Sequence, residues 1–341
     1  MLQSFLVEPG KIELRKVGVP RPARGELLVR VRAALTCGTD LKAFARGHPV
    51  IPMPGPFGHE FAGTVAAAGR GVSAFREGDE VMAVHSAPCL KCRYCRKGLH
   101  NLCENIMETK VLGAFAEYML LPANIVSQNV FLKPRGLPFE EAALLEPLSC
   151  VVHGVAPLGV RKGETALVVG AGPIGLLHYC LLSLKGVKAA VADINKARLR
   201  TARSFAGRGG VMDSSSKGMD ALAAEFTGGM GFDYVFECTG RPEVWESAVG
   251  FLRRGGALVL FGGCPRGTRV SYDTYRLHYD EITLRGVFHY RPEDVREAYE
   301  ILRRGRLRPA RFISGSYPLR KIQKAFERLS EGKGVKYAIV P

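Results

Sequence analysis

The sequence lacks any apolar run that could act as an export signal or cross a bilayer. Residues 1–16 alternate apolar and charged side chains, and the most apolar stretch, residues 142–160, is interrupted by Glu146, Pro147 and Pro157. These absences predict a cytoplasmic protein with no membrane attachment, in a compartment where structural disulfides are rare.

Acidic side chains are scarce: 32 Asp and Glu stand against 48 Lys and Arg, which gives a formal net charge of +16. The basic residues are scattered singly and in pairs, and no aromatic-interleaved basic block of the kind found in nucleic-acid modules occurs. We therefore expect no nucleic-acid partner. A phosphorylated or carboxylated substrate stays open, because bulk charge cannot decide it.

Internal repeats and low-complexity segments are also absent, and 341 residues are enough for about two domains. Residues 26–33 and 58–72 carry strand-like, glycine-punctuated patterns, so the first third is interpreted as an all-β region. From Thr165 onward strands alternate with helices, which predicts an α/β fold with a doubly wound parallel sheet. The strands of this sheet are expected at residues 166–170, 188–193, 231–240, 257–263 and 282–288.

Cysteine, in contrast, is concentrated: four of the nine cysteines form the run Cys89-x2-Cys92-x2-Cys95-x7-Cys103. A loop with this spacing can turn all four sulfurs onto one tetrahedral ion, and thiolates favour zinc in a closed, structural site. Two disulfides and an iron–sulfur cluster are the alternatives. The lack of an export signal disfavours the first, and the spacing differs from that of ferredoxins.

The segment Gly170-Ala171-Gly172-Pro173-Ile174-Gly175 follows a predicted strand and opens a predicted helix. In that context Gly170 permits the tight turn, Gly172 admits a pyrophosphate and Gly175 packs helix against strand. Asp193 closes the next strand, where an acid binds the ribose hydroxyls, so NAD is favoured over NADP. Arg198 follows closely in sequence and is a further candidate cofactor contact that weakens this preference. The nicotinamide side of the cofactor is expected at strand ends carrying Cys238, Thr239, Gly240, Gly262 and Gly263.

A second metal site is suggested by Cys37, His59, Glu60 and Glu146, which offer thiolate, imidazole and carboxylate ligands from separate loops. Such a set can hold zinc with one position left open for water or substrate. From these residues alone, a core thiol at Cys37 and a satisfied core histidine at His59 are equally good interpretations.

Taken together, these motifs resemble those of the medium-chain alcohol dehydrogenases. The stretch Gly58-His59-Glu60-x2-Gly63-x5-Gly69-x2-Val72 is similar to their zinc signature, and the cysteine run and the glycine fingerprint follow in the family's order. Cys37-Gly38-Thr39-Asp40 and Glu146-Pro147-Leu148-Ser149 resemble the polyol branch, typified by sorbitol dehydrogenase.

The resemblance covers the whole chain and implies two domains. A GroES-like, mostly β catalytic domain would comprise residues 1–152 and 289–341, with a structural zinc lobe at about residues 86–105. A Rossmann domain that binds NAD would comprise residues 153–288. The resemblance also implies a homo-oligomer, either a dimer or a tetramer.

The same resemblance implies two zinc ions per chain, one structural and one catalytic. The catalytic ion would be held by Cys37 and His59, with Glu60 and Glu146 as the candidate carboxylate groups. Which of the two glutamates binds the ion directly stays open. The implied reaction is NAD-linked interconversion of a secondary alcohol and its ketone, on a polyol, sugar alcohol or cyclitol, phosphorylated or not. Thr39 is the candidate first proton relay, with a plain turn hydroxyl as the alternative.

The substrate side departs from the sorbitol type, which carries an Arg-Tyr pair near the end of the last Rossmann strand. Here that place holds Phe288-His289-Tyr290-Arg291, so His289 stands where the arginine is expected. His289, Tyr290 and the loop residue His48 are candidate substrate contacts, and a surface position is the alternative for His48. The alternatives in function are an enzyme like L-threonine 3-dehydrogenase and a non-catalytic redox sensor that binds zinc and NAD.

Overall fold

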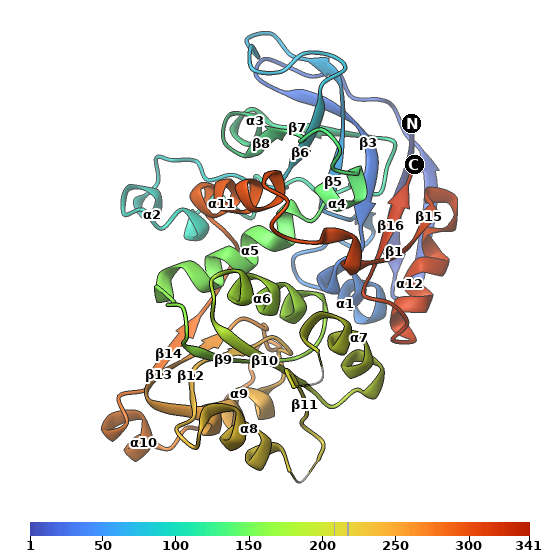
Figure 1. Cartoon of the computed structure of the whole chain (residues 1–341). Coiled ribbons are helices and arrows are strands. Elements are labelled where there is room, and N and C mark those ends of the chain that lie inside the picture. Colours follow the sequence, from blue (N-terminus) through green and yellow to red (C-terminus); the bar gives the residue numbers. More distant parts are fainter. Residues whose placement is uncertain (208, 217) are drawn as a thin grey trace. The chain divides into compact units, whose positions relative to one another are not determined.

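The computed structural model describes residues 1–207, 209–216 and 218–341. Within them the chain forms two compact units, the first made of Met1–Cys150 with Tyr290–Pro341 and the second of Val151–His289. Figure 1 shows both chain ends in the first unit, where they lie close together.

The first unit is built on a seven-stranded sheet with the order β15-β16-β3-β5-β6-β8, in which β7 also pairs with β3. A separate three-stranded sheet has the order β2-β1-β4. The strands are β1 (Leu2–Glu8), β2 (Lys11–Lys16), β3 (Leu27–Leu35), β4 (Gly55–Pro56), β5 (Glu60–Ala68), β6 (Glu80–Ala83), β7 (Tyr118–Leu121), β8 (Val130–Leu132), β15 (Ile313–Pro318) and β16 (Lys336–Val340).

Short helices connect these strands, and one of them, α5, runs across the division between the units. They are α1 (Gly38–Arg46), α2 (Arg93–Arg96), α3 (Ala123–Asn129), α4 (Phe139–Ala142), α5 (Leu145–Val155), α11 (Pro292–Arg303) and α12 (Ile322–Ser330).

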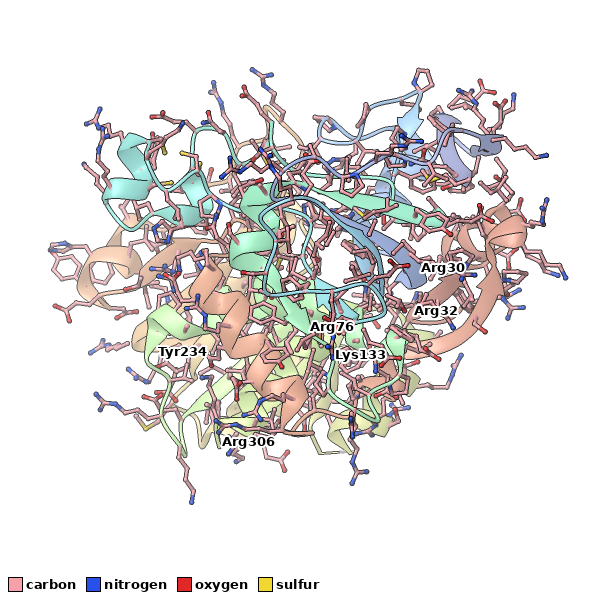
Figure 2. All side chains as sticks on the ribbon, turned by 90° about the horizontal axis from the view of Figure 1, so that it is seen from above. Arg30, Arg32, Arg76, Lys133, Tyr234 and Arg306 are labelled. Atoms are coloured by element: carbon pink, nitrogen blue, oxygen red, sulfur yellow. The ribbon has the colours of Figure 1, made fainter. Side chains whose placement is uncertain are left out.

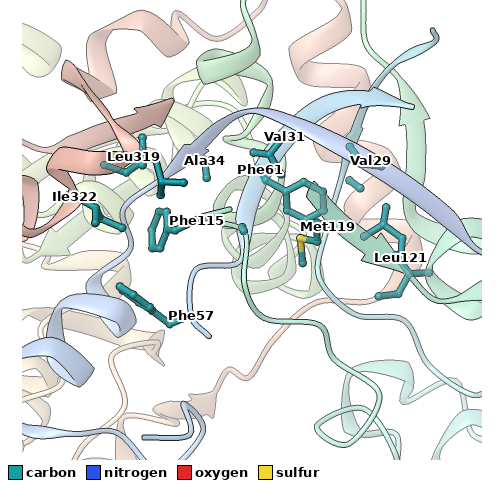
Figure 3. Close-up of a cluster of buried hydrophobic side chains, with 14 of the residues drawn as sticks. Val29, Val31, Ala34, Phe57, Phe61, Phe115, Met119, Leu121, Leu319 and Ile322 are labelled. Carbon is teal, nitrogen blue, oxygen red and sulfur yellow. The ribbon is translucent and has the colours of Figure 1, made fainter. Parts of the chain in front are cut away.

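Strand β3 shows how the sequence pattern builds the first unit. Val29 and Val31 are buried, whereas Arg30 and Arg32, which alternate with them, are exposed, as expected along a half-buried strand (Figure 2). The buried side chains join a core to which the far end of the chain also contributes, through Leu319, Ile322, Phe326 and Ile339 (Figure 3). Both chain ends are therefore parts of one hydrophobic core.

The second unit contains a six-stranded parallel sheet with the order β11-β10-β9-β12-β13-β14 (Figure 1). This is the strand order of a Rossmann sheet, and it confirms the predicted α/β doubly wound class. The strands are β9 (Thr165–Val169), β10 (Lys188–Asp193), β11 (Val211–Asp213), β12 (Phe232–Glu237), β13 (Leu252–Leu260) and β14 (Thr283–Gly286). The helices are α6 (Pro173–Leu184), α7 (Lys196–Ala206), α8 (Met219–Thr227), α9 (Pro242–Ala248) and α10 (Thr274–Tyr279).

One feature of the first third was wrongly predicted. The all-β interpretation missed α1, which begins directly after Cys37 and is capped by that residue: its Sγ accepts a hydrogen bond from the Thr39 backbone N–H at 3.5 Å. In the described ranges, no helix combines the length and apolarity needed to span a bilayer.

Candidate functional site

Cys37, His59 and Glu60 come together in the first unit. Their ligand atoms all lie within 4.8 Å of one another. The strand register explains the meeting, because Leu35 at the end of β3 pairs with Glu60 at the start of β5. His59 and Glu60 are buried and Cys37 is half-buried. One sulfur, one imidazole and one carboxylate at this spacing fit a zinc ion with an open fourth position.

Asp40 supports His59 from the first turn of α1. Its Oδ1 lies 3.4 Å from Nδ1 of His59, and the Asp40 side chain is fully buried. Burial alone would lower the pKa of His59, but the charges of Asp40 and Cys37 overcome it and hold that pKa well above its ordinary value. A carboxylate beside Nδ1 fixes the tautomer and leaves Nε2 as the nitrogen available to a metal.

Glu60 is paired with Lys336, a fully buried lysine at the start of β16. The ammonium Nζ donates to the two Glu60 oxygens at 2.7 and 2.5 Å and to the carbonyl oxygen of Thr36 at 2.9 Å. Burial lowers the pKa of Lys336, but the charges of Glu60, Cys37 and Glu146 together more than offset this and the pKa is raised. Two ionised oxygens offer about four lone pairs, so Glu60 can accept from Lys336 and still bind a metal.

Glu146, the fourth predicted ligand, lies outside this tight group. Its Oε1 is 3.4 Å from Nδ1 of His85 and accepts from the Cys150 thiol at 3.8 Å. Burial raises the pKa of Glu146 to about 7, with His59 lowering it and Glu60 raising it. The His85 ring centroid is 4.9 Å from that of His59. Glu146 is thus near the metal candidates but held by a different histidine.

His85 itself was missed from the sequence, as were the roles of Asp40 and Lys336. The available signal for His85 was weak, because a histidine just after a strand, here β6, has many structural explanations. Lys336 lies far from Glu60 in sequence, and no local pattern reveals that a lysine is buried.

The three candidate substrate residues have different local environments. The Tyr290 side chain is 1% exposed, and its hydroxyl bonds to Ser86 Oγ at 2.9 Å and His85 Nδ1 at 3.3 Å. The structure therefore gives Tyr290 a supporting position behind His85. His289 belongs to the second unit and has a φ of 63°, and His48 is half-buried in the loop after α1.

The four cysteines of the predicted structural site also converge. All four are free thiols, and their ligand atoms lie within 4.8 Å of one another, as one tetrahedral ion requires. Backbone N–H groups point at the sulfurs: Cys89 donates to Cys103 Sγ at 3.3 Å, and Cys92 donates to Cys89 Sγ at 3.3 Å. The N–H of Cys95 lowers the pKa of Cys92 to about 6. Such donors stabilise thiolates, the form that binds a metal.

The glycine fingerprint has the expected local geometry. Gly170 has a φ of 109°, and a Cβ on Gly175 would lie 1.8 Å from the Gly170 oxygen, so neither tolerates a side chain. A Cβ on Gly172 would meet nothing within 4 Å, which leaves space for a ligand where α6 begins at Pro173 and Ile174. The N-terminus of that helix favours an anion.

Asp193 is fixed beside the fingerprint at the end of β10. Its carboxylate accepts hydrogen bonds from the backbone N–H groups of Ala171 and Asn195, both at 2.8 Å. Arg198 Nη1 lies 3.8 Å from the same carboxylate, and its side chain is about half exposed (53%). Backbone donors therefore hold the acid in place, whereas the guanidinium next to it is about half exposed.

The remaining predicted cofactor residues meet at the carboxyl ends of two neighbouring strands. A Cβ on Gly262 would lie 2.2 Å from the Gly240 nitrogen, and one on Gly240 would lie 2.5 Å from the Gly263 oxygen. Buried Glu237 fixes the turn by accepting from the N–H of Thr239 at 2.6 Å. A Cβ on Gly170 would lie 3.3 Å from the backbone carbon of Cys238, so this turn adjoins the fingerprint.

Comparisons with known proteins agree with this geometry. Residues 23–131 match the alcohol dehydrogenase GroES-like domain, and residues 173–304 match the zinc-binding dehydrogenase domain. The chain is 33% identical to D-altritol 5-dehydrogenase of Agrobacterium fabrum, over 94% of each chain, and 29% identical to L-galactonate-5-dehydrogenase of Escherichia coli, over 94% of this chain and 93% of that one. A zinc-binding dehydrogenase from Sinorhizobium meliloti 1021, solved with NADP, is similar over 100% of this chain and 99% of that one, with 30% identity and a TM-score of 0.88.

Proposed function

The chain belongs to the zinc-dependent medium-chain alcohol dehydrogenases, in their polyol branch, and from this premise we propose that it interconverts a secondary alcohol of a polyol, sugar alcohol or cyclitol and the ketone with NAD. The observation that carries the proposal is the convergence of Cys37, His59 and Glu60. As a member of this family, the chain is an oxidoreductase that acts on small alcohols with a nicotinamide cofactor.

Cys37, His59 and Glu60 would hold the catalytic zinc, with Glu146 close by. The bound ion would supply a Lewis acid that lowers the pKa of an alcohol, while the nicotinamide accepts hydride. Lys336 holds Glu60 and Asp40 holds His59, so these two ligands are fixed before substrate arrives. Glu146, buried close to these ligands, would be the second carboxylate beside the ion.

Thr39 would pass the released proton toward solvent. It is half-buried in the first turn of α1, and its backbone N–H is bonded to the Cys37 sulfur, which places Thr39 next to a proposed zinc ligand. Thr39→Val, which removes the hydroxyl at similar volume, should lower kcat by about 10- to 1000-fold and leave zinc content unchanged. Thr39→Ser should recover most of the loss; equal activity of Thr39→Val and the wild type would assign Thr39 to the turn alone.

NAD preference over NADP rests on Asp193, whose ordered carboxylate would repel a 2′-phosphate. Asp193→Ser should weaken NAD and improve NADP, changing the ratio of their kcat/KM values by at least about 10-fold, since one charged hydrogen bond is worth roughly 1.5–3 kcal/mol. Arg198→Ala is the companion variant, because this arginine would accept the 2′-phosphate once Asp193 is removed. A wild type that prefers NADP would contradict the assignment.

Cys89, Cys92, Cys95 and Cys103 would hold a second, structural zinc, which gives two ions per chain. Metal analysis of the purified protein tests the count. One zinc per chain and no turnover of any secondary alcohol would instead favour the non-catalytic redox sensor.

The activity itself is tested with a panel of sugar alcohols, cyclitols, their phosphates and L-threonine, followed by NADH absorbance. Turnover of polyols that Cys37→Ser abolishes, with the fold intact by circular dichroism, supports the proposal. Preferential turnover of L-threonine would support the threonine 3-dehydrogenase alternative. We also propose a homo-oligomer, a dimer or a tetramer, to be measured by light scattering.

A further inference from the structure

Two half-buried lysines of the first unit, Lys42 and Lys110, form no ion pair with a carboxylate among the described residues. Lys110 Nζ donates to the neutral carbonyl oxygen of Val50 at 2.5 Å, and burial lowers the pKa of Lys110. Lys42, on α1, is half-buried too. Across the described parts of the chain, no ion pair joins Lys42 or Lys110 to an acidic side chain.

Two other lysines of the same unit that are shielded from water do have a carboxylate partner. Lys133 has a Glu80 oxygen at 2.9 Å, and the fully buried Lys336 has both oxygens of Glu60. An ammonium group that is partly removed from water normally needs such a counter-charge. Lys42 and Lys110 are therefore unusual in this unit, as half-buried cations for which the described residues provide no ion pair.

His48 marks the place where these cations gather. Burial lowers the pKa of His48, and Lys42, Lys110 and Arg46 lower it further, whereas Asp40 raises it. The His48 Nδ1 accepts from the Val50 N–H at 3.4 Å, so the loop that contacts Lys110 also carries this histidine. Lys110 thus contacts this loop directly, and Lys42 and Arg46 lie one helical turn apart on α1, the helix that leads into it.

The same helix links this loop to the candidate metal site. Cys37 caps α1, and Lys42 follows it by five residues, roughly 8 Å along the helix axis. Asp40, the acid that acts on His48, already lies 3.4 Å from His59. It therefore cannot serve as the full counter-charge of the cations.

We propose that Lys42, Arg46 and Lys110 form an anion-binding cluster that recognises a carboxylate or phosphate on the substrate. The preferred substrate is then a sugar acid or a polyol phosphate, in place of a neutral sugar alcohol. The inference rests on the proposed dehydrogenase function and specifies its substrate class. Charged hydrogen bonds to a partly shielded ammonium group are stronger than neutral ones, so an anionic group gains most at Lys110.

The kinetic test uses matched sets of a hexitol, its 6-phosphate and the corresponding aldonate, in several configurations. We expect the best anionic compound to exceed its neutral partner at least about 10-fold in kcat/KM. Lys110→Met should lower kcat/KM for that compound by about 10- to 100-fold, through KM, and change the neutral hexitol less than twofold. Lys16→Met, at an exposed lysine without an ion pair, removes the same charge and should change neither.

A binding measurement separates this inference from the dehydrogenase proposal. Calorimetric titration of the zinc-loaded protein with D-gluconate and with inorganic phosphate should show binding that weakens with added salt and is lost in Lys110→Met but not in Lys16→Met. The two ligands distinguish carboxylate from phosphate recognition. Neutral hexitols preferred over anionic ones, with Lys110→Met unchanged, would overturn the inference while the enzyme stands. If no alcohol is turned over, the dehydrogenase proposal fails, and Lys110-dependent binding alone then supports or overturns the cluster.

Discussion

At the residue scale, the most consequential contact is the buried ion pair between Glu60 and Lys336. Both side chains are almost wholly removed from water, and Lys336 contacts both carboxylate oxygens. Removing two charges from water costs a large desolvation free energy, and their mutual attraction offsets this cost only while both are present. The pair therefore holds a candidate metal ligand in place at the risk of strong destabilisation if either partner is removed.

Lys336→Met should lower the free energy of unfolding by about 3–5 kcal/mol, because it leaves the Glu60 carboxylate buried without a counter-charge. Urea denaturation of zinc-free protein measures the change. Lys333→Met, at an exposed lysine paired with exposed Glu331, is the control and should change stability by less than about 1 kcal/mol. Combining Lys336→Met with Glu60→Gln should recover part of the loss; a fully additive double variant would contradict the pairing.

Glu146 makes the stability of the zinc-free protein depend on pH. Burial raises its pKa from 4.5 to about 7, so the folded state favours the protonated form. The resulting stabilisation is complete below pH 4.5, is lost as the pH rises to 7, and is absent above. Relative to Glu146→Gln, the wild type should lose roughly 3 kcal/mol between pH 4.5 and 8, as urea denaturation at both pH values would show. A parallel pH dependence in the two proteins would contradict the shift.

The candidate site was predictable where ligand types and motifs carry the information. Cys37, His59, Glu60 and Glu146 were predicted as one set, and the structure brings the ligand atoms of the first three together. The groups that hold them were not predictable, because their role depends on burial and on partners far away in sequence. Lys336 is the clearest case: its sequence neighbours are ordinary, and only the pairing of β16 with β3 brings it to Glu60.

At the scale of elements, the predicted strands of the second unit occur, with ends that differ by a few residues. Residues 188–193 coincide with β10, whereas the strand expected at 257–263 is β13, which begins at Leu252. Buried apolar runs identify such strands well. Helix α1 was missed because the nine-residue segment opens with glycine and is capped by a cysteine, neither of which is a strong helix-start signal.

The loop that carries the four cysteines should depend on its metal for order. Its only regular elements are α2 and a short 3₁₀ turn, and its small core consists of Cys95, Cys103 and Ile106 with partly buried neighbours. Cys103→Ser should remove one zinc per chain and make residues 89–110 sensitive to protease, because the binding energy of a structural zinc is folding energy. Cys180→Ser, on α6, is the control. Unchanged zinc content in Cys103→Ser would contradict the assignment.

At the scale of the whole molecule, the two units have cores of different origin. The core of the second unit comes from one continuous segment, including Leu167, Val235 and Leu258. The first unit needs both chain ends, since β15 and β16 extend its sheet and Ile322 and Phe326 enter its core. The two units should therefore respond differently when the chain is divided.

Residues 151–289 produced alone should fold and bind NADH, since their sheet and core are complete without the rest of the chain. Residues 1–150 alone should not fold, because β3 would lose its partner β16 and the charge of Glu60 would lose Lys336. Joining residues 1–150 to 290–341 through a flexible linker should restore folding and zinc binding. Circular dichroism, NADH fluorescence and metal analysis decide each case, and a folded, cooperative 1–150 fragment would show that the C-terminal strands are dispensable.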